Sequence, residues 1–199
     1  PIYKEFKFMV YAVILAGGVG SRMGGDKPKQ YLTVKDKPII IYTIEKFIAV
    51  PQFEKIIVLC PKQWVEHTKN LVEKHIAPAK DSIAVIEGGD TRNETIMNAI
   101  SYIEQEGKLD DDTIIVTHDS VRPFVTNRII EENIEFAKQY GACDTVVPAT
   151  DTIVEALDNT IISSIPDRSK MYQGQTPQSF NALKLKNIYA ALTDEEKDI

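Results

Sequence analysis

Residues 11–18 read Tyr-Ala-Val-Ile-Leu-Ala-Gly-Gly, an unbroken apolar run that ends in small residues. A strand without alternating polar residues is typical of a sheet that is covered on both faces. Similar runs recur along the chain, separated by helical patterns, at 55–60, 83–86, 113–116 and 145–147. Strands that alternate with helices predict an α/β fold, Rossmann-like and doubly wound, with a mostly parallel sheet.

Capping residues predict where two of the helices begin and end. Thr126 or Asn127 is suited to open the helix before the last of these strands, and Gly141 is suited to end it. Ser179 or Asn181 is suited to open a later helix.

Two apolar stretches at 152–157 and 160–165 flank a turn at Asp158-Asn159. This pattern predicts a protruding β-hairpin arm over about residues 151–170. A two-stranded ribbon is only marginally stable alone, so we expect the arm to lean on the body or on a second subunit.

Charge and composition exclude several classes of function. Lys and Arg total 23 against 29 Asp and Glu, a formal charge of -6, which argues against a nucleic-acid partner. No apolar run approaches the roughly 18 residues that span a bilayer, so we expect a cytoplasmic protein without a membrane partner. Cys60 and Cys143 lack the spacing of a zinc site or a disulfide framework. We expect one domain over residues 1–199, with 1–8 as an extension before Met9.

The first apolar run leads into a glycine-rich loop with Gly17, Gly18 and Gly20. Glycines let backbone N–H groups approach a phosphate closely, and an open α/β sheet places its ligand at the carboxyl ends of the strands. The loop matches neither the dinucleotide fingerprint nor the P-loop. Arg22 within it and Lys29 after it nevertheless bring the positive charge that a triphosphate needs. A structural turn with solvated cations is the alternative.

Two other segments are rich in polar groups. Residues 88–95 open a helix after a strand, where side chains can read a base edge or where Thr91 or Asn93 simply caps the helix. Residues 166–168 and 172–180 are dense in amides and hydroxyls, which suits a hydroxylated, phosphorylated substrate. Covalent acyl chemistry is not indicated, because no Gly-x-Ser-x-Gly elbow and no Cys/His pair is present.

Residues 117–123 place an acid and a base after another strand. Asp119 can hold Mg²⁺, which takes one or two carboxylates plus phosphate oxygens. A structural ion pair between Asp119 and Arg122 is the alternative. His118 is expected to orient or pack, because no second His or Cys lies at ligand spacing.

Six motifs in order carry a resemblance to a known family: Leu15-Ala16-Gly17-Gly18 through Arg22-Met23, Pro28-Lys29-Gln30, Gly88-Gly89-Asp90 with Arg92, His118-Asp119 with Arg122-Pro123, Asp151-Thr152, and Thr176-Pro177-Gln178. They resemble the sugar-alcohol-phosphate cytidylyltransferases over nearly the whole chain from Met9. That family joins CTP to a polyol phosphate and releases pyrophosphate, with Mg²⁺.

The resemblance implies a role for each matching residue. Arg22 and Lys29 are the expected catalytic residues, which hold the CTP phosphates, and Asp119 is the expected Mg²⁺ ligand. The expected nucleotide-binding residues are Leu15, Ala16, Gly17, Gly18, Gly20, Gly89, Asp90, Arg92, Thr95, Asp119 and Ser120. The residues expected to face the acceptor, some of them across a homodimer made by the arm, are Arg122, Thr152, Arg168 and Thr176.

Within the family, residues 14–18, 117–119 and 171–180 resemble the ribitol-5-phosphate branch of teichoic-acid synthesis more than the methylerythritol-4-phosphate branch of isoprenoid synthesis. The expected product is therefore CDP-ribitol. Ser120 stands where the family commonly has alanine, and the family continues beyond residue 199 with a lysine-bearing strand that contacts the CTP phosphates. The alternatives are methylerythritol phosphate as the acceptor, a hexose-1-phosphate nucleotidyltransferase, and a nucleotide-binding module without catalysis.

Overall fold

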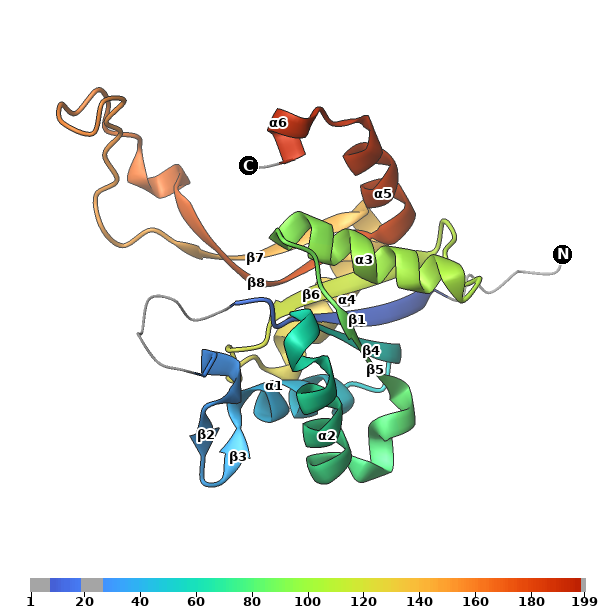
Figure 1. Ribbon diagram of the computed structural model, residues 1–199. Helices are drawn as coiled ribbons and strands as arrows, with labels where there is room; N and C mark the ends of the chain where they lie inside the picture. The colour runs from blue at the N-terminus through green and yellow to red at the C-terminus, as the bar shows by residue number, and fades with distance from the viewer. Residues whose placement is uncertain (1–7, 19–26, 198–199) are drawn as a thin grey trace, which may run out of the picture.

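The computed structural model describes residues 8–18 and 27–197. A six-stranded sheet forms its centre, in the order β5-β4-β1-β6-β8-β7 (Figure 1). The strands are β1 (Met9–Leu15), β4 (Phe53–Cys60), β5 (Ile83–Glu87), β6 (Thr113–Asp119), β7 (Ala142–Pro148) and β8 (Tyr172–Asn181). β5, β4, β1 and β6 pair in parallel, whereas β8 is antiparallel to both of its neighbours. The predicted mostly parallel, doubly wound sheet is confirmed.

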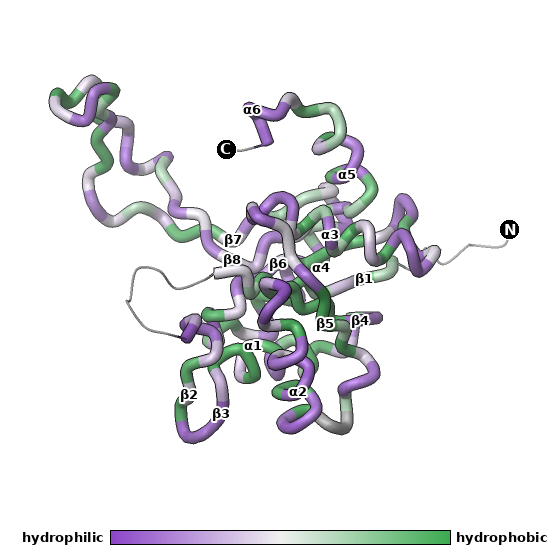
Figure 2. The backbone as a smooth tube through the Cα atoms, viewed as in Figure 1, coloured by the Kyte–Doolittle hydropathy of each residue, from purple (hydrophilic) through white to green (hydrophobic). Residues whose placement is uncertain are grey.

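Helices cover both faces of this sheet. Those of one face are α1 (Ile39–Ile48), α2 (Val65–His75) and α4 (Asn127–Tyr140), and those of the other are α3 (Arg92–Gln105) and α5 (Ala182–Ala191). Successive residues of β1 therefore enter two separate cores, with Ala12 and Ile14 in the first and Tyr11 and Val13 in the second. Both cores are apolar, which explains why the run shows no alternation. Figure 2 shows hydrophobic residues concentrated along α1 and the strands beside it.

Shorter elements complete the described chain. β2 (Thr33–Val34) and β3 (Lys37–Pro38) form a small antiparallel ribbon before α1, and α6 (Asp194–Lys197) follows α5. The 3-10 helices are η2 (Lys29–Tyr31), η3 (Lys62–Trp64), η4 (Ala77–Ser82) and η5 (Arg168–Lys170). None of the helices in the described part of the chain has the length and hydropathy that a membrane crossing requires.

The helix caps follow the residue types that the sequence offers. Thr126 opens α4, its hydroxyl oxygen accepting a backbone N–H of the first turn, and Gly141 ends it in the left-handed region at φ 85°. Asn181 opens α5 in the same way. Ser179 is instead a buried residue of β8, and its hydroxyl donates to Oδ1 of Asn133 at 3.1 Å.

Residues 172–180, which the sequence predicts only as an amide-dense binding segment, form most of β8 between β6 and β7. Pro177, Ser179 and Asn181 are its buried positions, which gives the period of two that a strand requires. Two of these three side chains are polar, so a hydrophobic pattern does not reveal the strand. Their burial depends on partners from other elements, such as the hydroxyl of Thr145 that donates to the carbonyl of Pro177 at 2.7 Å.

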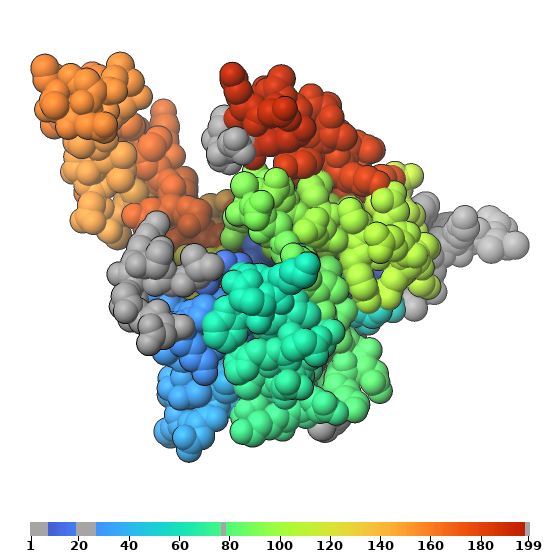
Figure 3. Space-filling view, viewed as in Figure 1, coloured from blue at the N-terminus to red at the C-terminus, as the bar shows by residue number. Residues whose placement is uncertain are grey.

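Residues 149–171, called the arm, protrude from the body between β7 and β8, as predicted (Figures 1 and 3). The two predicted strands of a hairpin do not form. The arm has one antiparallel bridge, which joins Glu155 to Ser164. The predicted turn is present, with Asn159 at φ 60°. Apolar side chains of the arm stay in solvent, as Leu157 does at 83% exposure, so burial does not offset the entropy of ordering a ladder.

Candidate active site

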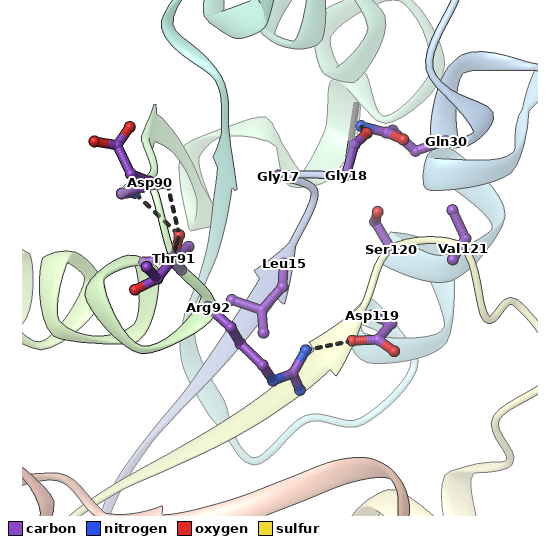
Figure 4. A pocket seen from close by; sticks show the side chains of 12 residues that line it. Leu15, Gly17, Gly18, Gln30, Asp90, Thr91, Arg92, Asp119, Ser120 and Val121 are labelled. Carbon is purple, nitrogen blue, oxygen red and sulfur yellow. Dashed lines mark hydrogen bonds and ion pairs between the residues drawn. The ribbon is translucent and has the colours of Figure 1, made fainter. Parts of the chain in front are cut away.

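The carboxyl ends of β1, β5 and β6 meet at one edge of the sheet, where a cavity of about 350 Å³ opens (Figure 4). Its walls come from the loops after these strands and from η2, and consist of Leu15, Gly17, Gly18, Gln30, Gly89, Asp90, Thr91, Arg92, Thr95, Asp119, Ser120 and Val121. Open α/β sheets bind ligands at this edge, and the volume lies in the range of small-molecule sites. The cavity is therefore the candidate active site.

Most of the residues predicted to bind nucleotide line this cavity. Ala16 does not, because it is buried at 1% exposure. Gly20 and the predicted catalytic residue Arg22 lie outside the described residues. Lys29, the other predicted catalytic residue, directly precedes the lining residue Gln30 in η2.

Three lining residues were not predicted to bind a ligand: Gln30, Thr91 and Val121. Gln30 belongs to the Pro28-Lys29-Gln30 motif, so the motif signals it. Thr91 was considered only as a helix cap, and it does cap α3, because its hydroxyl accepts the backbone N–H of Glu94 at 3.1 Å. Nothing in the sequence marks Val121.

The glycines of the cavity wall differ in the space that surrounds them. A Cβ placed on Gly17 or Gly18 would meet nothing within 4 Å, and neither has a positive φ. A Cβ on Gly89 would lie 2.4 Å from the Cβ of Glu94. Gly89 is therefore required by the packing of the α3 N-terminus, whereas Gly17 and Gly18 border space that residues 8–18 and 27–197 leave open.

Alanine substitutions separate these two cases. We expect Gly17→Ala to melt within about 2 °C of the wild type and to weaken binding of CTP, the nucleotide that the resemblance implies, at least about tenfold, because the added methyl group would enter the cavity. We expect Gly89→Ala to destabilise the fold by roughly 1–3 kcal/mol through overpacking. Thermal unfolding and calorimetry with CTP check both variants. Unchanged CTP affinity of Gly17→Ala would contradict the expected role of this glycine in nucleotide binding.

Asp119, at the end of β6, binds two arginines from different parts of the chain, of which Figure 4 shows Arg92. Its Oδ1 accepts from Nη1 of Arg92 at 2.7 Å, and its Oδ2 accepts from Nε of Arg122 at 2.9 Å. Arg92 also donates to Oε1 of Gln178 at 3.2 Å, and Arg122 to Oε1 of Gln175 at 3.0 Å. The ion pair between Asp119 and Arg122 is thus present, as part of a network that joins α3, β6 and β8.

Two opposing effects set the charge of Asp119. Burial raises the pKa of its carboxyl group, but hydrogen bonds and charge from Arg92 and Arg122 outweigh burial and hold the pKa below its ordinary value. The carboxylate is therefore ionised at neutral pH. Two guanidinium groups against one carboxylate leave the network with a net positive charge, which suits a phosphate group.

His118 contacts the backbone of Arg122, a member of this network. It is fully buried, its ring centroid lies 5.2 Å from that of Phe47, and Nε2 lies 3.0 Å from the carbonyl oxygen of Arg122. A carbonyl oxygen only accepts, so Nε2 carries the proton. Burial lowers the pKa of the ring, which keeps it neutral at pH 7. These contacts agree with the expected orienting and packing role.

The donors around the cavity limit how Mg²⁺ can bind. Within residues 8–18 and 27–197, no group of three or more His, Cys, Asp and Glu side chains is placed to hold a metal ion. Both oxygens of Asp119 already accept from guanidinium groups. One carboxylate suits a Mg²⁺ ion that brings phosphate oxygens with it, but it does not suit an ion held by the protein alone.

The residues predicted to face the acceptor fall into two groups. Arg122 and Thr176 lie beside Asp119, whose backbone N–H donates to Oγ1 of Thr176 at 3.5 Å. Thr152 and Arg168 lie on the exposed arm, where Arg168 donates to the carbonyl of Thr150 at 3.1 Å.

Several solved structures of other proteins are similar to this chain. The structure of 2-C-methyl-D-erythritol 4-phosphate cytidylyltransferase from Francisella tularensis is 30% identical, covers 94% of this chain and 83% of that chain, and has a TM-score of 0.69. Two others share the fold at lower identity. The 4-diphosphocytidyl-2C-methyl-D-erythritol synthase from Anaerococcus prevotii is 24% identical, with coverage of 96% and 81% and a TM-score of 0.74. The 2-C-methyl-D-erythritol 4-phosphate cytidylyltransferase from Thermus thermophilus is 23% identical, with coverage of 96% and 79% and a TM-score of 0.66.

The family match extends over almost the entire chain. Residues 10–198 match the family described as 2-C-methyl-D-erythritol 4-phosphate cytidylyltransferase. Members of that family are cytidylyltransferases, a kind of nucleotidyltransferase. Because the match spans far more than half of the sequence, this protein belongs to the 2-C-methyl-D-erythritol 4-phosphate cytidylyltransferase family.

Proposed function

We propose that the protein transfers a cytidylyl group from CTP to the phosphate of a polyol phosphate. In this reaction an acceptor phosphate oxygen bonds to the α-phosphorus of CTP, the bond from that phosphorus to the bridging oxygen breaks, and pyrophosphate leaves with the electron pair. The cavity at the carboxyl ends of β1, β5 and β6, with its net positive Asp119 network, carries this proposal. Phosphate oxygens are the ligands that such a network recognises.

Charge stabilisation is assigned to Lys29 and Arg22. Negative charge grows on the α-phosphate and on the departing pyrophosphate, and fixed cations stabilise it most when they are already in position. Backbone at Gly17 and Gly89, with the side chains of Asp90 and Thr95, surrounds the space proposed for cytosine and ribose. A non-catalytic nucleotide-binding module would not need cations at the leaving group.

Two acceptors are proposed, in order. The first is 2-C-methyl-D-erythritol 4-phosphate, because the matched family and the similar solved structures carry that substrate in their names. The second is D-ribitol 5-phosphate, for teichoic-acid synthesis, because residues 117–119 and 171–180 resemble that branch. Both acceptors present a phosphate to Arg122 and hydroxyl groups to Thr176.

Mg²⁺ fits this reaction as an ion that arrives with the triphosphate. Asp119 would hold it together with phosphate oxygens, and the ion would neutralise charge on the leaving pyrophosphate. Arg92 and Arg122 each donate a hydrogen bond to the carboxylate of Asp119, which lines the cavity.

The arm is proposed to complete the acceptor site of a second copy of the chain. Thr152 and Arg168 lie on it, outside the cavity of their own chain. Exposed apolar side chains at Leu157 and Ile161, at 83% and 72% exposure, support burial against another subunit.

A panel of acceptors tests the proposed function. Pyrophosphate release is measured with CTP and Mg²⁺ in the presence of 2-C-methyl-D-erythritol 4-phosphate, D-ribitol 5-phosphate or glycerol phosphate, with UTP and ATP as controls. We expect turnover with CTP and methylerythritol phosphate that exceeds turnover with the other acceptors at least about tenfold. Preference for ribitol phosphate would select the second candidate. Tight CTP binding without turnover on any acceptor would support a non-catalytic module.

A further inference from the structure

Gln30 ties the glycine-rich loop to η2. Its side chain is 2% exposed, and its single amide nitrogen donates to the carbonyl of Ala16 at 2.7 Å and to that of Gly18 at 3.0 Å. These bonds bridge 14 and 12 residues of sequence. Both N–H groups of the amide are therefore used on the backbone of the loop that lines the cavity (Figure 4).

The next residue fixes η2 from the other side. Tyr31 is fully buried, and its ring stacks on Trp64 with centroids 4.6 Å apart. Its hydroxyl group lies 2.8 Å from Oγ1 of Thr68 on α2. η2 is thus held between α2, through Tyr31, and the loop after β1, through Gln30.

The hydrogen bond from Gln30 to the carbonyl of Ala16 also determines the direction of the N–H of Gly17. The peptide bond is planar and trans, so its carbonyl and the following N–H point in opposite directions. With the carbonyl of Ala16 directed at Gln30, the N–H of Gly17 is directed away from Gln30. Within the described part of the chain, a Cβ at Gly17 would meet nothing within 4 Å, so the described residues leave open space beside this backbone.

We propose that Gln30 is a positioning residue, which holds the backbone of Ala16–Gly18 and the neighbouring Lys29 in the relative placement that CTP requires. The proposal rests on the nucleotide site of the proposed function. Gln30 acts through the loop backbone and through η2, and the reacting phosphates are left to Lys29 and Arg22.

The chain carries a matched control for Gln30. Residues 61–64 read Pro-Lys-Gln-Trp and form the 3-10 helix η3, just as residues 28–31 read Pro-Lys-Gln-Tyr and form η2. Gln63 is exposed and lies outside the cavity wall. The same substitution at both glutamines therefore separates the loop contact from the local effect of a changed residue in such a helix.

The test compares Gln30→Glu, Gln30→Met and Gln63→Glu with the wild type. Glu places a carboxylate that only accepts hydrogen bonds against two carbonyl oxygens, and Met removes the donors without adding charge. For both Gln30 variants we expect the Kd for CTP to rise at least about tenfold and kcat to fall, with faster amide exchange in a peptide that covers residues 14–18. Gln63→Glu is expected to match the wild type in all three measurements.

The possible outcomes distinguish failure of the positioning role from failure of the proposed function. If a folded Gln30→Glu or Gln30→Met variant binds CTP and turns over like the wild type, the proposal is overturned. If affinity, kcat and exchange follow only a lowered melting temperature, and recover when measured well below it, Gln30 is merely structural and the proposal also fails. If the wild type itself does not bind CTP, the proposed function fails first, and the positioning role fails with it. Should Gln30→Glu not fold, Gln30→Met, which carries no charge, decides the matter.

Discussion

Replacing Lys29 with alanine is expected to lower kcat by about 100- to 1,000-fold, the cost of roughly 2.7–4 kcal/mol that follows the loss of one preorganised contact to a developing charge. The Kd for CTP is expected to change far less. Charge accumulates on the leaving pyrophosphate only as the α-phosphorus is attacked, so the ammonium group contributes most in the transition state. The position of Lys29 depends on η2, which Gln30 and Tyr31 hold on two sides.

Lys62→Ala is the matched control, because Lys62 begins η3 as Lys29 begins η2 and is exposed. Steady-state pyrophosphate release gives kcat, and calorimetry with CTP gives the Kd. A near-normal kcat for Lys29→Ala would move this lysine to a structural role. An equal loss for Lys62→Ala would show that the effect is not specific to the cavity.

Asp119→Asn is expected to fold and to lose activity by about 100-fold. An amide has one neutral acceptor oxygen where two guanidinium groups and an incoming Mg²⁺ ion need a carboxylate. The loss of stability is expected to be only about 1 kcal/mol, because the side chains are 24% exposed at Asp119, 43% at Arg92 and 48% at Arg122, and partly exposed pairs contribute little. Raised Mg²⁺ is expected to restore part of the activity.

Thermal unfolding beside a Mg²⁺ titration of activity separates the catalytic and structural roles of Asp119. A loss of stability of about 3–5 kcal/mol without rescue by Mg²⁺ would identify a purely structural ion pair. Asp81→Asn, at an exposed carboxylate outside the cavity wall that has no ion pair among the described residues, is the control for loss of charge.

The pH dependence of stability follows from the lowered pKa of Asp119. A carboxyl whose pKa is lower in the folded state contributes stability above its unfolded pKa, about 3.9, and loses that contribution as the pH falls through the folded pKa. The difference in unfolding free energy between the wild type and Asp119→Asn is therefore expected to stay constant above about pH 5 and to shrink below about pH 4. Denaturant unfolding at several pH values measures it. A difference that shrinks between pH 6 and 8 would contradict this account.

The sequence by itself determined that the sheet is mostly parallel and covered on both faces, and it predicted the edge at which the candidate site lies. The unbroken run in β1, and the similar runs in β4, β5 and β6, require two apolar covers, and parallel strands require helical crossovers between them. Glycines and polar residues after these strands then converge, because parallel strands end at the same edge. These features depend on local residue types and on the spacing of apolar residues, both of which can be read from a single sequence.

Tertiary structure alone decided the rest. The hydrophobic pattern of the sequence does not reveal β8, because its buried residues Ser179 and Asn181 are polar. Their burial becomes favourable only when groups such as Asn133 reach them from distant elements. The pairing of Arg92 with Asp119 spans 27 residues, and that of Gln30 with Ala16 joins η2 to the loop after β1. Such contacts depend on which groups the packed helices bring within hydrogen-bond distance, and neither periodicity nor spacing along the chain encodes that distance.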